Sequence, residues 1–167
     1  MSARAPEAWP DLGGRLVRDA DGIHHVLPVR VYFEDTDFSG LVYHASYVRW
    51  CERGRSDYLR HVGNDHRALI AGSTGREPAA FVVRRMNIEF LKPGRIDDVV
   101  EVVTRVAEIG AATLALDQRI RRVGSQGAPG ELMTAQVLVV LVSQTGKVLR
   151  LSGLLRDALA RKTPRPD

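Results

Sequence analysis

One long helical pattern, set between strand patterns, constrains the fold of this chain more than any other feature. From about Tyr43 to His61, apolar or small residues recur at the three- and four-residue spacing of one helix face. This face comprises Tyr47, Cys51, Gly54, Tyr58 and Val62. Much of the remaining surface of the helix is charged, through Arg49, Glu52, Arg53, Asp57 and Arg60. Gly63 and Asn64 predict the end of the helix.

Strand patterns precede and follow this helix. The first begins near Val26, and its alternation predicts a shared face for Leu27, Val29, Val31 and Phe33. After a connection over residues 64–78, which includes a short helical turn at 67–71, further strands are predicted at 82–91, 98–108, 112–123 and 132–143. An edge at 148–151 and a short last helix from Ser152 to Leu159 complete the pattern. We therefore predict an α+β fold in which a curved antiparallel sheet wraps one long helix.

The chain is predicted to form a single domain, because its 167 residues suffice for one hydrophobic core. Residues 1–23 lack periodicity and are predicted to be an irregular N-terminal arm. Residues 24–160 form the predicted domain, and residues 161–167 a flexible tail. Gly54 lowers helix propensity by about 1 kcal/mol relative to alanine. A close approach of the sheet to the helix at this position would compensate for that loss.

Composition excludes several classes of function. Aromatic residues make up only 6% of the chain and the net charge is +4, which argues against a nucleic-acid partner. The single cysteine, Cys51, forms neither an internal disulfide nor a cysteine zinc site, and we predict a packed thiol. No transmembrane segment is expected, because the longest apolar run, residues 137–142, is too short to span a bilayer. Without a signal-peptide pattern at the N-terminus, a cytoplasmic location is predicted.

The histidines give no metal-binding signal. His24, His25, His61 and His66 follow no spacing that is typical of metal ligands, so no metal site is predicted. Three basic clusters are candidate phosphate contacts, but solvated side chains are their default interpretation, and no glycine-rich phosphate loop is present. The clusters are Arg84 with Arg85, Arg119 with Arg121 and Arg122, and Lys147 with Arg150.

An acidic turn lies just before the long helix. It carries Glu34, Asp35 and Asp37, and Ser39-Gly40 separates it from the helix. A carboxylate here would lie beside the unpaired backbone N–H groups of the helix start, where a carbonyl group could be polarised and attacked. From the residues alone, Asp37 is either such a reactive group or a turn or helix cap. Asp35 and Thr36 are expected to shape the turn.

Two blocks of sequence carry a family resemblance. The segment RVYFEDTDFSGLVYHASYVRWCERGRSDYLR, residues 30–60, resembles the signature of the 4-hydroxybenzoyl-CoA thioesterase family. Within that family, it is most similar to the Tol-Pal-associated acyl-CoA thioesterase branch. The segment AFVVRRMNIEFLKPGRIDD, residues 80–98, matches the family's next strand and loop. The resemblance implies the hotdog fold and hydrolysis of an acyl-CoA to a free acid and CoA.

The resemblance also implies roles for individual residues. Asp37 matches the catalytic aspartate, as general base or nucleophile, and the backbone amide of His44 would polarise the thioester carbonyl. The imidazole of His44 is a substrate contact, a proton carrier or an exposed helix-end side chain. Expected substrate-binding residues are Tyr43, Gly40, Tyr47, Arg84 and Arg85. Of these, Tyr47 has core packing as its alternative role, and the two arginines would contact the CoA phosphates.

No metal or separate cofactor is expected, because CoA arrives as part of the substrate. The resemblance further implies a homodimer or homotetramer whose protomers join sheets edge to edge, with active sites at the shared interface. The alternative function is a non-catalytic acyl-CoA or acyl-carrier binding partner of a cell-envelope complex. A hydratase on the same fold is a third hypothesis, but the His/Asp/Glu patterns of such enzymes are not found.

Overall fold

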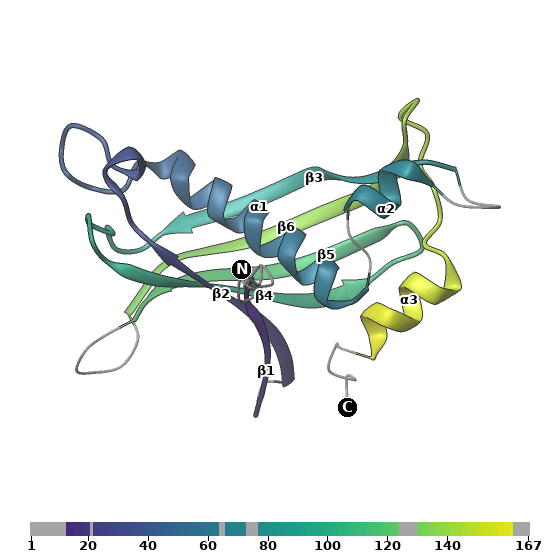
Figure 1. Ribbon diagram of the computed structural model, residues 1–167, viewed down its shortest axis with the longest axis horizontal. Coiled ribbons are helices and arrows are strands. Elements are labelled where there is room, and N and C mark those ends of the chain that lie inside the picture. The colour runs from purple at the N-terminus through teal and green to yellow at the C-terminus, as the bar shows by residue number, and fades with distance from the viewer. Residues whose placement is uncertain (1–12, 21, 64–65, 73–76, 124–129, 162–167) are drawn as a thin grey trace, which may run out of the picture.

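A six-stranded antiparallel sheet and one long helix form the core of the structure, a computed structural model that describes residues 13–20, 22–63, 66–72, 77–123 and 130–161 (Figure 1). The strand order across the sheet is β1-β2-β4-β5-β6-β3. The strands are β1 (Arg15–Asp19), β2 (Gly22–Arg30), β3 (Ala79–Phe90), β4 (Val99–Ile109), β5 (Thr113–Arg122) and β6 (Gly130–Ser143). The helices are α1 (His44–His61), α2 (His66–Ala71) and α3 (Gly153–Ala160), and a 3₁₀ turn covers Phe33–Asp35.

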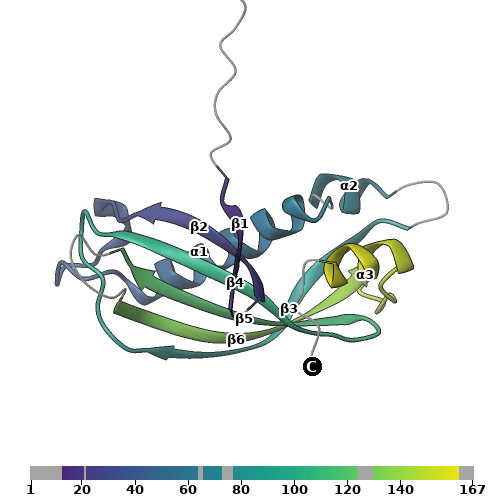
Figure 2. The same cartoon turned by 90° about the horizontal axis from the view of Figure 1, so that it is seen from below.

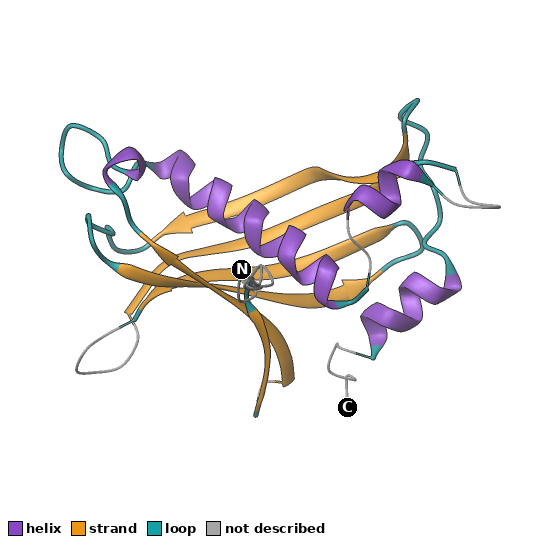
Figure 3. Cartoon of the chain, viewed as in Figure 1, coloured by secondary structure: helices purple, strands orange, loops and turns teal. Residues whose placement is uncertain are grey.

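Helix α1 lies across one face of the sheet, and the sheet curves around it (Figure 2). Its predicted apolar face is buried, with Tyr47, Cys51 and Tyr58 all within the hydrophobic core. Colouring by secondary structure shows one long helix against the sheet, with the two short helices at one end (Figure 3). The predicted α+β fold is therefore confirmed, and the observed bounds of α1 differ from the prediction by one residue at its start.

Gly54 lies where α1 and the sheet approach each other most tightly. A Cβ atom at this position would lie 2.9 Å from both Thr104 Oγ1 and Val102 Cγ1, two side chains of β4. The predicted close approach is confirmed. Beside it, Gln118 donates hydrogen bonds to Thr104 Oγ1 and to the backbone oxygen of Cys51, so the buried polar groups of this region satisfy one another.

The alternation of side chains along the strands also follows the prediction. On β4, Val100, Val102 and Val106 are buried, and on β5 the buried face includes Leu114, Leu116 and Ile120. In β6, Val139, Val140 and Leu141 are consecutive and all buried, which confirms that this strand is covered on both faces.

Three local predictions are wrong. Arg15–Asp19 is not irregular but forms β1, which pairs antiparallel with the first part of β2. A charged, five-residue edge strand has no clear periodicity, so only its pairing reveals it. Phe33 does not share a face with Val31: the strand ends at Arg30, and Phe33 begins the 3₁₀ turn with 81% of its surface exposed. The expected edge at 148–151 is only an isolated bridge from Val148 to Val142.

Several predictions fall outside the described residues. They concern most of the N-terminal arm (1–12), Asn64, the glycine-rich connection at 73–76, the loop at 124–129 and the tail at 162–167. Gly63 is described, and its φ of +81° with an N–H bond to the Arg60 oxygen confirms the predicted helix stop. Among the helices of the described residues, none is long and apolar enough to cross a membrane.

Candidate active site

The segment between β2 and α1 is held in shape by the buried side chain of Asp35. Its Oδ2 accepts a 2.9 Å hydrogen bond from the backbone N–H of Tyr32, and its backbone oxygen accepts bonds from Tyr43 N–H and Ser46 Oγ. Thr36 closes the same turn through bonds to the backbone oxygen of Phe33. The prediction that Asp35 and Thr36 shape the turn is confirmed. Asp35 thus anchors the loop, while Asp37 remains on the surface.

Asp37 lies in a tight turn that fixes one of its carboxylate oxygens. The backbone N–H of Ser39 donates to Oδ1 at 2.8 Å, and the Ser39 hydroxyl donates to the same oxygen at 2.5 Å. Gly40 closes the turn through a bond to the backbone oxygen of Asp37, with a φ of +74° that favours glycine. The Ser39 hydroxyl, then its N–H, and to a lesser degree the charge of His44 hold the pKa of Asp37 below its ordinary value. Oδ2 makes none of these bonds.

The start of α1 presents an unpaired amide close to this carboxylate. Helix α1 begins at His44 after the N-cap residue Tyr43, whose side chain forms no capping bond. Within the described part of the chain, no acceptor binds the backbone N–H of His44. The imidazole of His44 packs at a tilt against the ring of Tyr43, with ring centroids 4.4 Å apart, and edge-on against Phe90, with centroids 6.4 Å apart. Both side chains are exposed, and the helix dipole adds partial positive charge at this end.

A pocket of about 370 Å³, here called the Asp37 pocket, joins these groups. Its lining comprises Asp37, Ser39, Leu41, Val42, His44, Tyr47, Phe90, Leu91, Lys92 and Pro93. The pocket therefore brings together an ionised carboxylate, the first turn of α1 and an apolar wall from the end of β3. Lys92 is the only lysine or arginine in this lining.

Tyr47 combines the two roles that the sequence left open. It is buried in the core, where its ring packs against Trp50 and Phe90. Its hydroxyl accepts a 2.8 Å hydrogen bond from the backbone N–H of Gly94, and its side chain also lines the Asp37 pocket. Burial raises the pKa of the Tyr47 hydroxyl, which keeps it neutral.

The remaining predicted substrate-binding residues lie apart from the lining of this pocket. Gly40 belongs to the turn that follows Asp37. Arg84 and Arg85 are exposed on β3, at a bulge in its pairing with β6. Their predicted contacts with substrate stay predictions.

A second, smaller pocket lies nearer the other end of α1. This pocket, here called the Phe81 pocket, has a volume of about 110 Å³ and a mostly apolar lining. It comprises Glu52, Arg55, Ser56, Tyr58, Leu59, His66, Phe81, Val83, Leu114, Leu116 and Val139. From His44 to Ser56 the rise along α1 is about 18 Å at 1.5 Å per residue. The Asp37 pocket and the Phe81 pocket are therefore lined by different parts of α1, and the sequence indicated only the Asp37 pocket.

Sequence reasoning also missed a buried cluster of His25, Asp57 and His61. Asp57 was assigned to the polar surface of the helix, but it is buried against β2. The spacing of Asp57 and His61, four residues apart in one helix, is the only local signal. The predicted packed thiol is confirmed, because Cys51 is fully buried and burial raises its pKa to about 12.

Comparison with known proteins identifies relatives of this chain. The sequence profile of the thioesterase superfamily matches residues 39–128, more than half of the chain. The acyl-CoA thioester hydrolase YbgC of Escherichia coli is 45% identical over 116 residues, which are 69% of this chain and 79% of that protein. A probable thioesterase from Bartonella henselae has a crystal structure that is 40% identical, with a TM-score of 0.70 over 77% of this chain and 99% of that one.

A more distant structure shares the fold. It is a 4-hydroxybenzoyl CoA thioesterase, 18% identical, with a TM-score of 0.72 over 81% of this chain and 98% of its own. Together these similarities confirm the predicted hotdog fold and the predicted family resemblance.

Proposed function

The chain belongs to the thioesterase superfamily, and from this premise we propose that it hydrolyses an acyl-CoA thioester in the Asp37 pocket. The general class of enzyme is borne out by its 45% identity to a protein named acyl-CoA thioester hydrolase. The observation that carries the proposal is that the Asp37 carboxylate and the first turn of α1, with its unpaired His44 N–H, line the same pocket. The profile match begins at residue 39, so the role of Asp37 rests on this geometry and on the sequence resemblance.

In the proposed reaction, the thioester carbonyl oxygen points at the backbone N–H of His44. This donor and the helix dipole stabilise the negative charge that develops on that oxygen. Asp37 either takes a proton from a water that attacks the carbonyl carbon, or attacks that carbon itself to give an anhydride that water then hydrolyses. In both routes the carbon–sulfur bond breaks, and the sulfur leaves as the thiol of CoA. The two bonds from Ser39 to Oδ1 support these roles, because they favour the ionised form of Asp37 and do not involve Oδ2.

The free edge of β3 supports the proposal of a homo-oligomer. In the described part of the chain, β3 pairs only with β6 and so lies at the edge of the sheet, and its exposed residues include both apolar (Val82, Val83, Phe90) and charged (Arg84, Arg85, Glu89) side chains. The unpaired backbone groups of an edge strand are a template for pairing with another strand. Two copies of β3 that pair antiparallel near Met86 would bring the Phe81 end of the strand in one protomer beside the Leu91 end in the other.

That pairing would place the Asp37 pocket of each protomer next to the Phe81 pocket of its partner. Leu91 lines the Asp37 pocket and Phe81 lines the Phe81 pocket, so each Asp37 pocket would face the apolar pocket of the partner. We propose that this small pocket receives the acyl group while CoA extends outward. Dimer and tetramer remain alternatives, as does an acyl-carrier protein in place of CoA.

The test of the proposal is turnover by the Asp37→Asn variant. CoA thiol release would be followed with a panel of acyl-CoAs, and Asp157→Asn, at an exposed position of α3, is the matched control. Loss of roughly a hundredfold or more in kcat is expected for Asp37→Asn, because it removes a positioned base or nucleophile. The control should retain the natural rate, and circular dichroism should show both variants folded. Unchanged turnover in Asp37→Asn would refute the role of Asp37.

The same panel of acyl-CoAs distinguishes an enzyme from the alternative, a non-catalytic binding protein. A protein that binds acyl-CoA in a calorimeter but releases no thiol from any acyl group would be the non-catalytic binding partner. The predicted cytoplasmic location, and the absence of a cofactor from the reaction, stay predictions.

A further inference from the structure

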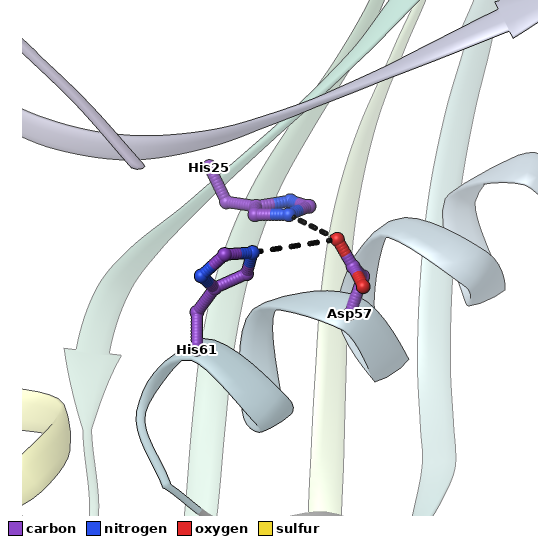
Figure 4. Close-up of side chains that lie close together, drawn as sticks. All are labelled: His25, Asp57 and His61. Carbon is purple, nitrogen blue, oxygen red and sulfur yellow. Dashed lines mark hydrogen bonds and ion pairs between the residues drawn. The ribbon is translucent and has the colours of Figure 1, made fainter. Parts of the chain in front are cut away.

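Three ligating side chains meet where the N-terminal hairpin of β1 and β2 packs on the last turns of α1 (Figure 4). His25 comes from β2, and Asp57 and His61 come from successive turns of α1. His25 Nε2 lies 2.7 Å from Asp57 Oδ2, and His61 Nε2 lies 3.7 Å from the same oxygen. Both imidazole rings point toward the carboxylate, and the three ligand atoms lie within 4.8 Å of one another.

This cluster is shielded from solvent. The side chain of His25 is fully buried, that of Asp57 is 4% exposed and that of His61 is 27% exposed. Nδ1 of His25 is buried without a partner among the described residues, so all polar contacts of this ring run through Nε2 into the cluster. Two imidazoles and one carboxylate, from two packed elements, therefore direct their ligand atoms toward one point.

A fourth possible ligand atom, a backbone oxygen, lies beside these three. The backbone oxygen of Gly14, just before β1, lies 2.8 Å from His61 Nε2. With metal–ligand distances of about 2.0–2.1 Å, neighbouring ligand atoms of a tetrahedral zinc site are about 3.3 Å apart. The observed separations of 2.7, 3.7 and 2.8 Å bracket this value, so shifts of less than about 1 Å along them would suit such an ion.

We propose that His25, Asp57 and His61, with the Gly14 carbonyl, bind a divalent transition-metal ion of the zinc class that fastens the N-terminal hairpin to α1. Two imidazole nitrogens and two oxygens are a ligand set that suits zinc, cobalt and nickel. The ion replaces the hydrogen bonds that His25 Nε2 and His61 Nε2 form with Asp57 and the Gly14 oxygen. Each neutral imidazole binds through Nε2 and carries its one proton on Nδ1, so a proton that lay on Nε2 is transferred to Nδ1 through solvent and is not released.

Two contacts compete with the ion for Asp57. Arg60 pairs with Oδ1, and the backbone N–H of Gly14 donates to Oδ2 at 2.5 Å. The Arg60 side chain is 59% exposed, so it can stay on Oδ1 or turn into water at little cost. Burial is the main cause that lowers the pKa of His25, and it keeps this ring neutral, as a metal ligand must be.

This site is distinct from the Asp37 pocket, whose lining shares no residue with it. It lies at the opposite end of α1 and would act on the attachment of the hairpin, not on the thioester. Sequence spacing did not predict it, because His25 is distant in sequence from the helical pair.

Metal binding by the untagged full-length chain tests the proposal. After treatment with EDTA and its removal, zinc chloride would be titrated by calorimetry into the natural protein, His61→Ala and His66→Ala. His66→Ala is the matched control, because it removes a histidine beyond the cluster that instead bonds to Ser56. We expect one zinc ion per chain in the natural protein and in the control. In His61→Ala, binding should weaken by roughly tenfold to a hundredfold or more.

Thermal unfolding supplies a readout that does not depend on activity. Excess zinc should raise the unfolding midpoint of the natural protein and of His66→Ala relative to EDTA, because the ion binds the folded chain. The rise should be absent in His61→Ala, whose partly exposed side chain can be removed without opening the core. Equal zinc affinity in all three proteins, or no zinc-dependent rise in the natural one, would overturn the proposal and leave a cluster that holds protons only.

Discussion

Replacement of Gly54 by alanine would place a methyl group where α1 contacts β4. The new carbon would lie 2.9 Å from Thr104 Oγ1 and 2.9 Å from Val102 Cγ1, well inside the 3.5–4.0 Å of an ordinary carbon contact. Neither neighbour can yield easily, because both are fully buried and branched at Cβ. A shift of Thr104 would also strain the 2.8 Å bond that its hydroxyl accepts from Gln118.

The expected loss of stability follows from three contributions. Overpacking a core costs about 1–3 kcal/mol, and a weakened buried hydrogen bond costs about 1 kcal/mol. Alanine returns about 1 kcal/mol of helix propensity relative to glycine. Gly54→Ala should therefore lower the free energy of unfolding by about 2 kcal/mol, which is a fall of about 4–8 °C in the unfolding midpoint for a chain of this length.

The assay is chemical or thermal unfolding at a fixed protein concentration, because an oligomer unfolds in a concentration-dependent way. Gly153→Ala is the matched control, since Gly153 is the first residue of α3 and a Cβ there meets nothing within 4 Å. The control should be as stable as the natural protein or slightly more stable. If Gly54→Ala is equally stable, the tight contact of α1 with β4 does not exist as described.

Three further substitutions or treatments test the site and the core. Removal of the Ser39 hydroxyl in Ser39→Ala should raise the pKa of Asp37 toward its ordinary value. The ionised form would then be lost at a higher pH, so the acidic limb of the kcat/KM profile should move to higher pH; an unmoved limb would contradict this role of Ser39. Tyr47→Phe leaves the buried Gly94 N–H without its acceptor and should cost about 1–3 kcal/mol of unfolding free energy, and an unchanged midpoint in denaturant would count against that bond. Cys51 should not react with a thiol reagent in the native protein at pH 8 but should react fully in denaturant, and rapid native labelling would show that it is not buried.

The predictions that succeeded depend on patterns of short range. The apolar face of α1 follows from a repeat within the helix, and the buried faces of β4 and β5 follow from alternation along each strand. The turn around Asp35 and Gly40 was also predictable, because an aspartate that bonds to nearby N–H groups and a glycine with positive φ act on their immediate neighbours.

The predictions that failed concern residues whose environment is set by distant segments. Phe33 continues an apolar alternation, but the buried carboxylate of Asp35 turns the chain before it and leaves its ring exposed. Arg15–Asp19 has no periodic pattern and was predicted to be irregular, but it pairs with β2 as a strand. Asp57 reads as a surface residue of α1, although His25 of β2 covers it.

The elements, the fold class and the position of the acidic turn before α1 could be read from the amino-acid sequence, because these properties arise from side chains close together along the chain. The folded structure was needed to show which strands are neighbours, that β3 lies at the edge of the sheet, and that the Asp37 and Phe81 pockets are lined by different parts of α1. It was also needed to show that His25 meets Asp57 and His61. These contacts join residues far apart in sequence, and the packing of the whole sheet on the helix brings them together.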